Sequence, residues 1–448
     1  MRKIYSAALC VVLASNLAGA QEVMRLSMAE CMDYAMKHNN SVRNAAIDVL
    51  IQDAQNRQTL SASRPHINGK GEVDYMHIPQ KSFLDASAFN PSLPTGTIAP
   101  VAFSLPYASS VGATASQLVF DGAVFIALKA RRSVLELAKS NEKATQESIR
   151  YNVFKAYNSL VIAYRQFEIV KNSLGFARSL ERDLEITRKN GFAEKIDVER
   201  TSVQVNNLAT DSIRIANLLT VSEDVLKFQI GLGMNVSIAL TDTGIEQHKA
   251  DALALLAEEE NYERIPEYNT ASTALKLNQY NLKRYKYSAL PTVNVFWAYG
   301  TNYGSDKFEH IFDKLYRYEL SSAFGLQINL PIYNGGLRLQ QVRESQLNIE
   351  KSNNNISLIK ESIDFQVAIS RTTLRNALLQ VQSQKRNMEL ADDVLDLAQK
   401  KFKAGVGSNM EITQAQTDQL RAQNGYFSAL LDVTNAEADL RKALGLLK

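Results

Sequence analysis

Four short stretches of the chain alternate apolar and polar residues with the period of a β-strand, and they occur as two separated pairs. The first pair covers about 67–78 and 107–119, and the second covers about 292–303 and 320–331. A strand with this alternation has one apolar face and one polar face that contacts water. The clearest apolar series is Val293, Val295, Trp297, Tyr299 and Tyr303. We therefore predict four half-buried strands.

Long stretches without an internal proline follow each pair of strands and carry apolar residues at helical spacing. They run over 122–188, 195–230, 336–402 and 409–445. At 1.5 Å per residue, the first of these would form a helix about 100 Å long. A compact globular domain needs no helix of that length, so the pattern indicates rods or the wall of a tunnel.

Shorter elements complete each half of the chain. A helix is predicted over 27–60, where Ser27 and Glu30 have the spacing of a capping box, and another over 251–288, interrupted near its proline. The proline-rich stretch 79–106 is predicted to be a loop.

The second half of the chain repeats the first. Residues 191–232 align with 405–446 at a constant offset of 214 and without a gap. The repeated unit reads helix–strand–strand–helix–helix, with a first repeat over 21–232, a connecting segment over 233–262 and a second repeat over 263–448. A duplicated unit of this kind is an architecture rather than a catalytic site, and it favours a conduit or a scaffold.

The first twenty residues have the pattern of a secretory signal peptide. A basic start precedes an apolar run over 4–17, and the small residues 18–20 predict cleavage after Ala20. Because alanine stands where a lipid-modified cysteine would be required, we expect no lipid anchor. Removing the signal lowers the formal charge from +3 to +1, which gives no support for nucleic-acid binding.

Cys31 is the only cysteine of the expected mature chain, so no intramolecular disulfide is possible. Export without disulfides fits a bacterial envelope protein. After the signal there is no run of eighteen apolar residues, so a membrane-spanning form would have to be a closed β-barrel. Such barrels need about eight strands or more, and three copies of the chain would supply about twelve.

Short motifs at equivalent places in the two halves resemble those of the TolC-like outer-membrane efflux family. Two are strand-to-helix junctions, Phe120-Asp121-Gly122 and Tyr333-Asn334-Gly335-Gly336, and two are helix turns, Arg188…Gly191…Asp197-Val198 and Phe402…Gly405…Glu411-Ile412. Their order, spacing and repetition extend the resemblance over essentially the whole mature chain.

The resemblance implies a mainly α fold with β-strands and a homotrimer. Each subunit would contribute four strands to a 12-stranded outer-membrane β-barrel, continued by a long α-helical tunnel in the periplasm of a Gram-negative bacterium. It also implies a passive exit duct of a tripartite efflux or type I secretion system. The expected partners are further copies of the chain, outer-membrane lipid, a periplasmic adaptor (membrane fusion) protein and an inner-membrane transporter, and no cofactor is expected.

The two helix turns are the predicted periplasmic tips, because each joins two rod-like helices far along the chain from the strands. The residues predicted to dock the adaptor are Gly191, Phe192, Gly405, Val406 and Gly407. The simpler interpretation is that the glycines only allow a positive φ at a helix C-cap.

Carboxylates just past the tips are candidates for a pore constriction. Asp197 and Glu411 are equivalent in the two repeats, and a trimer would carry six such groups. A ring of acids favours cations. Gln414 occupies the position, one turn deeper, where relatives often carry a second carboxylate, and a Tyr–Arg lock of some relatives is replaced by Phe402 and Gly407. The simpler interpretation is that acids in a first helical turn offset the helix dipole, with Ser408 and Glu411 as a capping box.

Aromatic residues in the strand regions are candidates for the girdles found at membrane interfaces. The alternative is ordinary packing of strands in a soluble sheet. The girdle candidates are Tyr75, Tyr107, Trp297, Tyr299 and Tyr303.

No motif in the chain indicates an enzyme, a nucleotide site or a metal site. The five histidines are scattered, and HExxH, CxxC, GxGxxG, GxxxxGK[ST] and GxSxG are absent from the sequence. The main alternative function is a periplasmic coiled-coil adaptor or scaffold, whose strands would form one consecutive β-rich domain. A secreted hydrolase is a third alternative, and it lacks any catalytic constellation.

Overall fold

The computed structural model describes residues 23–90, 92–242, 248–310 and 319–447. The expected signal peptide, 1–20, lies outside the described residues. The chain divides into two compact units: residues 51–136 with 273–353 form the sheet unit, and residues 23–50, 137–272 and 354–447 contain the described part of the helical unit. Helices α3 (Gly122–Lys189) and α7 (Leu337–Lys403) contribute residues to both units.

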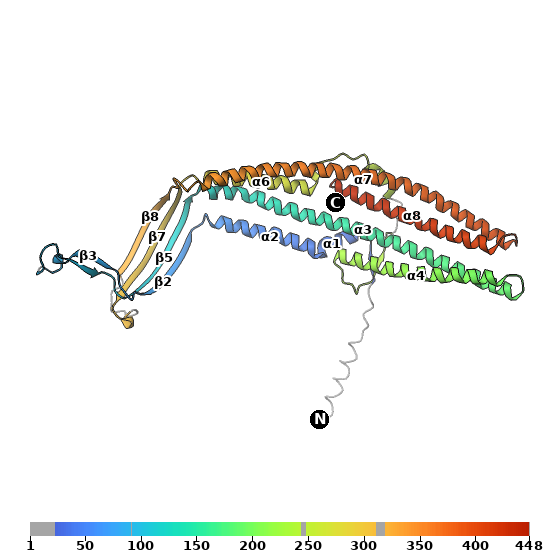
Figure 1. The fold of residues 1–448 in the computed structure, drawn as a ribbon, viewed down its shortest axis with the longest axis horizontal. Helices are drawn as coiled ribbons and strands as arrows, with labels where there is room; N and C mark the ends of the chain where they lie inside the picture. The colour runs from blue at the N-terminus through green and yellow to red at the C-terminus, as the bar shows by residue number, and fades with distance from the viewer. Residues whose placement is uncertain (1–22, 91, 243–247, 311–318, 448) are drawn as a thin grey trace, which may run out of the picture. The chain divides into compact units, whose positions relative to one another are not determined.

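The sheet unit is built on four antiparallel strands in the order β2-β5-β7-β8 (Figure 1). Their bounds are β2 (His66–Tyr75), β5 (Tyr107–Phe120), β7 (Thr292–Ser305) and β8 (Glu319–Asn329). The central ladder, β5 with β7, therefore joins the two sequence repeats. The outer strands β2 and β8 are each paired on one side only among the described strands.

Helices enter and leave this sheet at one end. Helix α2 (Asn40–Ser61) leads into β2, α3 follows β5, α6 (Pro266–Tyr287) leads into β7, and α7 follows β8. Gly122 begins α3 where the backbone of α6 passes close by: a Cβ on Gly122 would lie only 2.6 Å from the Tyr287 carbonyl oxygen. A side chain at this position would push the two helices apart.

The stretch 79–106 is not a simple loop, as the sequence predicted, because it contains a short β-hairpin. Strand β3 (Lys81–Asp85) pairs antiparallel with β4 (Ile98–Ala102). The Asp85 carboxylate closes the turn by accepting hydrogen bonds from the backbone N–H groups of Ser87 and Gly96, both at 3.0 Å. Prolines are tolerated here because both strands of an isolated hairpin are edge strands.

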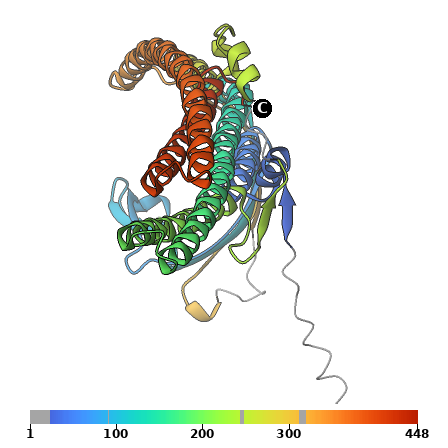
Figure 2. The same ribbon diagram turned by 90° about the vertical axis from the view of Figure 1, so that its right-hand side faces the viewer.

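The helical unit has its main apolar core where two helix pairs meet the short helix α1 (Met28–His38). The pairs are α3 with α4 (Lys195–Ile230) and α7 with α8 (Asn409–Ala443); Figure 2 views them from the end that carries their turns. Beside them, β1 (Met24–Leu26) and β6 (Ile238–Leu240) form a parallel pair that the sequence did not predict. The fully buried core residues include Leu160, Leu226, Leu374 and Leu440.

The predicted helix over 27–60 is wrong in one respect, because the chain breaks at Asn39 into α1 and α2. The Ser27–Glu30 capping box at its start is confirmed. The Asn39 side chain donates to the Gln229 carbonyl oxygen (2.8 Å) and accepts from the Ser41 N–H (2.8 Å). These contacts stabilise the break, since they satisfy backbone groups that the helix ends leave free.

The predicted helix over 251–288 is likewise two helices. Helix α5 (His248–Leu255) ends early, a 3₁₀ turn spans Tyr262–Arg264, and α6 begins at Pro266. Proline suits the first position of a helix, because its missing N–H has no partner there in any case.

The four long helices lie within two residues of the ranges expected from the sequence. The compact units, however, do not follow the sequence repeats, because each unit takes segments from both halves of the chain. The repeat describes the order of elements along the chain. Each compact unit instead forms where elements of the first half pack beside elements of the second half. Over the described ranges, no helix combines the length and apolar character needed to cross a bilayer.

Candidate functional site

Both turns between the long helices have the same backbone construction. Gly191 (φ 83°) and Gly405 (φ 76°) each end a helix in the left-handed region. The N–H of the following residue bonds back to the last helical turn, from Phe192 to the Thr187 carbonyl oxygen (3.0 Å) and from Val406 to that of Lys401 (3.1 Å). This is the hydrogen-bond pattern of a glycine C-cap, so the structural role predicted for these glycines is present.

The turns also present bare apolar side chains. Phe192 is 85% exposed and Val406 is 79% exposed, and Met410 beside the second turn is exposed too. A phenylalanine that faces solvent contributes no buried surface to its own chain, so packing within the chain does not explain its position. Gly407 has an ordinary φ, but a Cβ there would lie 2.8 Å from the Phe402 nitrogen, so the turn is too tight for a side chain.

Behind the turns, the two helix pairs are held together by an apolar cluster and one buried amide. Helices α3, α7 and α8 supply the buried members of the cluster, and Val198 of α4 packs against them; the buried members are Leu180, Leu184, Leu395, Ala398, Ile412 and Ala415. Asn409 is only 5% exposed and donates to the Asp197 carbonyl oxygen and to the Thr201 hydroxyl, both at 3.2 Å. The first turns of α4 and α8 are therefore tied directly to each other.

The candidate constriction residues lie on these same first turns. Asp197 is half-buried on α4, whereas Glu411 and Gln414 are exposed on α8. The Ser408 hydroxyl accepts the Glu411 N–H (3.2 Å), so Ser408 caps α8 as expected. The Gln414 amide donates to the Asp418 carboxylate at 2.9 Å.

Asp418 is a residue that the sequence reasoning missed. It lies seven positions after Glu411, which puts both carboxylates on one face of α8 with Gln414 between them. The Arg421 guanidinium lies 3.5 Å from Asp418. This face of α8 therefore carries two acids, one amide and one base. The spacing i, i+3, i+7 of Glu411, Gln414 and Asp418 was the signal in the sequence that could have revealed it.

The strand ladders sort the side chains of the sheet into two faces. Paired positions show Trp297 beside Ala115 and Phe324, and Val295 beside Gln117 and Leu326. This face exposes large apolar side chains: Ile67, Val73, Val111, Leu320, Phe324, Leu326 and Ile328. The opposite face carries Asn68, Lys70, Glu72 and Asp74 of β2 opposite small residues of β5 and β7.

The aromatic candidates fall into two groups along the strands. Tyr75 and Tyr107 are paired and stacked (ring centroids 4.7 Å) at the end where the β3–β4 hairpin connects. Trp297 and Tyr299 are exposed six to eight residues from the β7 residue that pairs with Tyr107. Tyr303 differs from these four, because it is only 7% exposed. Tyr333, at the strand-to-helix junction, is 85% exposed and was not among the predicted aromatics.

Comparison with known proteins agrees with this architecture. Residues 266–446 match the family model described as outer membrane efflux protein. The probable efflux pump outer membrane protein TtgC of Pseudomonas putida is 22% identical over 429 residues, which cover 94% of this chain and 83% of TtgC. Outer membrane protein TolC of Escherichia coli is 20% identical over 448 residues, covering 97% and 84%.

A solved structure of CusC, whose title refers to transmembrane channel formation, has the same fold. Its TM-score is 0.71 at 18% sequence identity, and the match covers 93% of this chain and 92% of the CusC chain. The chain is similar to the TolC-like outer-membrane efflux family, whose model matches its residues 266–446. The predicted fold class is therefore confirmed, and the relatives agree with the predicted family: they include outer-membrane proteins of efflux pumps and an alkaline protease secretion protein.

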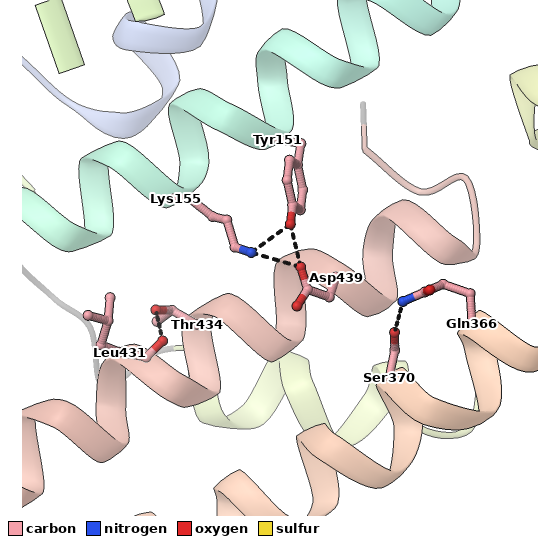
Figure 3. Close-up of polar contacts among 7 residues, drawn as sticks. All are labelled: Tyr151, Lys155, Gln366, Ser370, Leu431, Thr434 and Asp439. Atoms are coloured by element: carbon pink, nitrogen blue, oxygen red, sulfur yellow. Dashed lines mark hydrogen bonds and ion pairs between the residues drawn. The ribbon is translucent and has the colours of Figure 1, made fainter. Parts of the chain in front are cut away.

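One further polar site of this chain was not predicted. Tyr151 and Lys155 of α3 converge on Asp439 of α8 (Figure 3). The Tyr151 hydroxyl donates to Asp439 at 2.5 Å, and the Lys155 ammonium lies 2.6 Å from that hydroxyl and 2.9 Å from the carboxylate. The Lys442 ammonium sits 4.7 Å from the centre of the Tyr151 ring. No short motif could have revealed this site, because 284 residues separate Lys155 from Asp439.

The environment shifts the ionisation of both donors in this polar site. Burial raises the pKa of the Tyr151 phenol, and its hydrogen bond to Asp439 acts in the same direction. For Lys155, burial alone lowers the pKa, but hydrogen bonds to Tyr151 and Asp439, with attraction to Asp439, outweigh it and raise the pKa. The site thus favours a neutral phenol and a charged ammonium across the two helix pairs.

Proposed function

We propose that three copies of this chain form a passive exit duct of the outer membrane, serving a tripartite efflux or type I secretion system. The observation that carries the proposal is the four-stranded sheet, which has one apolar face, one polar face and two open edges. Such a sheet cannot seal itself in lipid, where an unpaired backbone group costs several kcal/mol. Pairing β8 of one copy with β2 of the next would close the sheet.

Exposed apolar side chains on α7 support the same assembly. Leu358, Phe365 and Leu379 lie seven and fourteen positions apart, and all three are exposed on the single chain. A seven-residue repeat of this kind is the seam along which a helix packs against a partner helix. Neighbouring copies are the partner that fits, because the sheet edges require them as well.

The two tips are the proposed docking site for a periplasmic adaptor, which would in turn contact an inner-membrane transporter. Phe192 and Val406 provide the bare apolar surface, and Gly191, Gly405 and Gly407 give the turns the shape that presents it. In the same proposal Asp197, Glu411 and Gln414 line the constriction behind the tips. Tyr75, Tyr107, Trp297 and Tyr299 contact the membrane interfaces.

Export of the chain belongs to the same proposal. The signal peptide would be removed after Ala20, leaving a mature chain without a lipid anchor. Mass spectrometry of protein purified from the outer membrane would test this directly. A mass above that of the chain beginning at Gln21 by two or three acyl groups would contradict it.

Fractionation, native size and conductance together test the duct. We expect the protein in the outer-membrane fraction, with three times the mass of the chain in native mass spectrometry and stable channels in a planar bilayer. A water-soluble monomer in the periplasmic fraction would sink the proposal. The exported cargo follows from a deletion strain exposed to a panel of toxic compounds.

A further inference from the structure

A pocket between three helices of the sheet unit has the chemistry of an anion site. It has a volume of about 350 Å³ and lies between α2, α3 and α6. These helices connect to β2, β5 and β7, which are neighbours in the sheet of one chain. The pocket therefore belongs to a single subunit and does not depend on the edges that meet other copies.

The polar part of the pocket lining includes several hydrogen-bond donors, among them two guanidinium groups. Arg131 of α3 and Arg284 of α6 both line it, together with the amides of Gln52, Asn56 and Asn281. None of the described residues that line it is acidic. Arginine is the side chain best suited to bind phosphate or carboxylate, because its planar fork donates two parallel hydrogen bonds.

Neither guanidinium is neutralised by an ion pair within the described part of the chain. The Arg131 Nη1 makes one long hydrogen bond, 3.4 Å, to the Asn56 carbonyl oxygen, and its Nε is buried without a partner among the described residues. Arg284 stacks on the Tyr285 ring and donates to its hydroxyl (3.1 Å). A buried donor without a partner is costly unless something occupies the space beside it.

Neighbouring acids on α2 and α3 form ion pairs with other residues and not with Arg131 or Arg284. Asp53 of α2 pairs with Arg57 at 2.9 Å, and Glu136 of α3 pairs with Arg132 at 3.3 Å. Both pairs lie outside the pocket lining. The pocket thus keeps a local positive charge in a chain whose formal net charge is only +3.

The pocket lining also includes apolar side chains, which narrow the class of ligand further. Ile126, Val134 and Leu277 line it. A pocket of this volume has room for a phosphate ester as well as for free phosphate, and the carbon groups of the ester would contact these apolar side chains.

In the proposed outer-membrane duct, on which this step rests, the pocket would lie near the lipid headgroups. Arg284 lies one turn before the end of α6, and Arg131 lies nine residues into α3, about 14 Å along the helix. The pocket therefore lies just beyond the ends of the strands, and a polar headgroup layer adjoins the hydrocarbon core of a bilayer.

From this arrangement we propose that the α2–α3–α6 pocket binds a phosphate group, with Arg131 and Arg284 as its ligands. A phospholipid headgroup of the periplasmic leaflet and a free phosphate share this chemistry, and the test separates them. The inference goes beyond the proposed export duct, because the site holds a lipid or an anion rather than the cargo.

Native mass spectrometry of the delipidated full-length protein in neutral detergent tests the site. The probes are dioleoyl phosphatidylglycerol, dioleoylglycerol, which has the same tails without phosphate, and inorganic phosphate as a competitor. We expect selective retention of the phospholipid over the diacylglycerol. In the R131Q/R284Q variant that retention should weaken about tenfold or more, because charge-assisted hydrogen bonds are lost.

The matched control is R132Q/K286Q, which removes the same charge from the same two helices outside the pocket lining. This control should retain the phospholipid as the wild type does. Competition by millimolar inorganic phosphate alone would identify free phosphate as the source, and its failure would identify the headgroup. Ala127→Leu, which keeps both arginines but fills the pocket, should also weaken retention.

Equal retention by R131Q/R284Q and R132Q/K286Q would overturn the proposal, and so would equal retention of diacylglycerol and phospholipid. The same spectra report the oligomeric state, so a variant that fails to assemble is recognised and the Ala127→Leu variant decides. Channel conductance is measured separately, and loss of the lipid site leaves the evidence for the duct unchanged.

Discussion

At the scale of single residues, the polar site of Tyr151, Lys155 and Asp439 joins the two helix pairs through charge rather than apolar contact. Lys155 and Asp439 are partly exposed, so water screens their attraction and each bond contributes modestly. The hydroxyl between them accepts from Lys155 while it donates to Asp439, so the three groups depend on one another. Removing one member therefore removes two of the three contacts.

This polar site predicts a loss of stability at high pH. The pKa values of Tyr151 and Lys155 are both raised in the folded chain, from ordinary values of 10.0 and 10.5. Their stabilisation is therefore fully present below pH about 10 and is lost as the pH rises through the folded-state pKa values. We expect wild type to lose about 1 kcal/mol more than Lys155→Met between pH 8 and pH 11.

Thermal unfolding followed by circular dichroism at both pH values measures this difference. Tyr151→Phe serves as a second variant, since it removes the titrating phenol and keeps the ring beneath Lys442. An identical pH dependence in wild type and both variants would show that the three groups are not coupled in solution.

The glycines of the turns predict opposite effects from one chemical change. Gly405→Ala places a Cβ on a residue with a φ of 76° and should cost about 1 kcal/mol of stability. Gly175→Ala, inside α3 with open space around it, should instead stabilise by about 0.5–1 kcal/mol, because alanine favours a helix. Denaturant unfolding of the two variants in parallel would contradict the turn geometry if both shifted stability in the same direction.

At the scale of elements, the two faces of the sheet determine which substitutions the membrane tolerates. Phe324 of β8 is 78% exposed on the apolar face, and its neighbour Ala323 points to the opposite face beside Ala298. Phe324→Lys should therefore cost about 2–4 kcal/mol in a bilayer, while Ala323→Lys should be tolerated. The yield of assembled protein in the outer membrane distinguishes the two, and equal yields would refute the assignment of the lipid face.

Periodicity predicted most of these elements, because long strands and helices repeat a local preference many times. The long helices and the four principal strands follow directly from patterns of period 3.6 and 2. The breaks at Asn39 and before Pro266 were missed, because side-chain capping and packing decide them rather than periodicity. The three-residue strands β1 and β6 are too short to carry any period, and only their tertiary pairing defines them.

The candidate site was predictable only where it repeats. Gly191 and Gly405 stood out because both halves of the chain carry them at the same place in a turn. The contacts of Asn409 and the α2–α3–α6 pocket were invisible in the sequence, because each depends on segments far apart in the chain. Tyr303 was predicted to lie at the surface, and its burial reflects packing that alternation alone does not determine.

At the scale of the whole molecule, the acids behind the tips predict the ion preference of the duct. A trimer would carry six carboxylates from Asp197 and Glu411, with Asp418 farther along α8. A ring of acids attracts cations and repels anions. The D197N/E411Q variant should therefore shift the reversal potential in a salt gradient towards zero, with little change in assembly.

Planar-bilayer recording across a tenfold salt gradient provides that measurement. Asp211→Asn with Asp53→Asn is a control of equal charge at positions outside the tips, where each acid is ion-paired on its own helix. An unchanged reversal potential in D197N/E411Q would place the selective part of the duct elsewhere.

The unpaired margins of β2 and β8 also have a consequence for biogenesis. Until each edge strand pairs with another strand, a newly exported subunit presents unpaired backbone donors and acceptors to any extended peptide nearby. Exposed edge strands of this kind promote aggregation. Subunits released slowly into the periplasm would therefore be vulnerable to mispairing and proteolysis, and escort by a chaperone would protect them. If the chain is overproduced faster than it can be inserted into the outer membrane, the excess should be found as degraded monomers rather than as assembled channels.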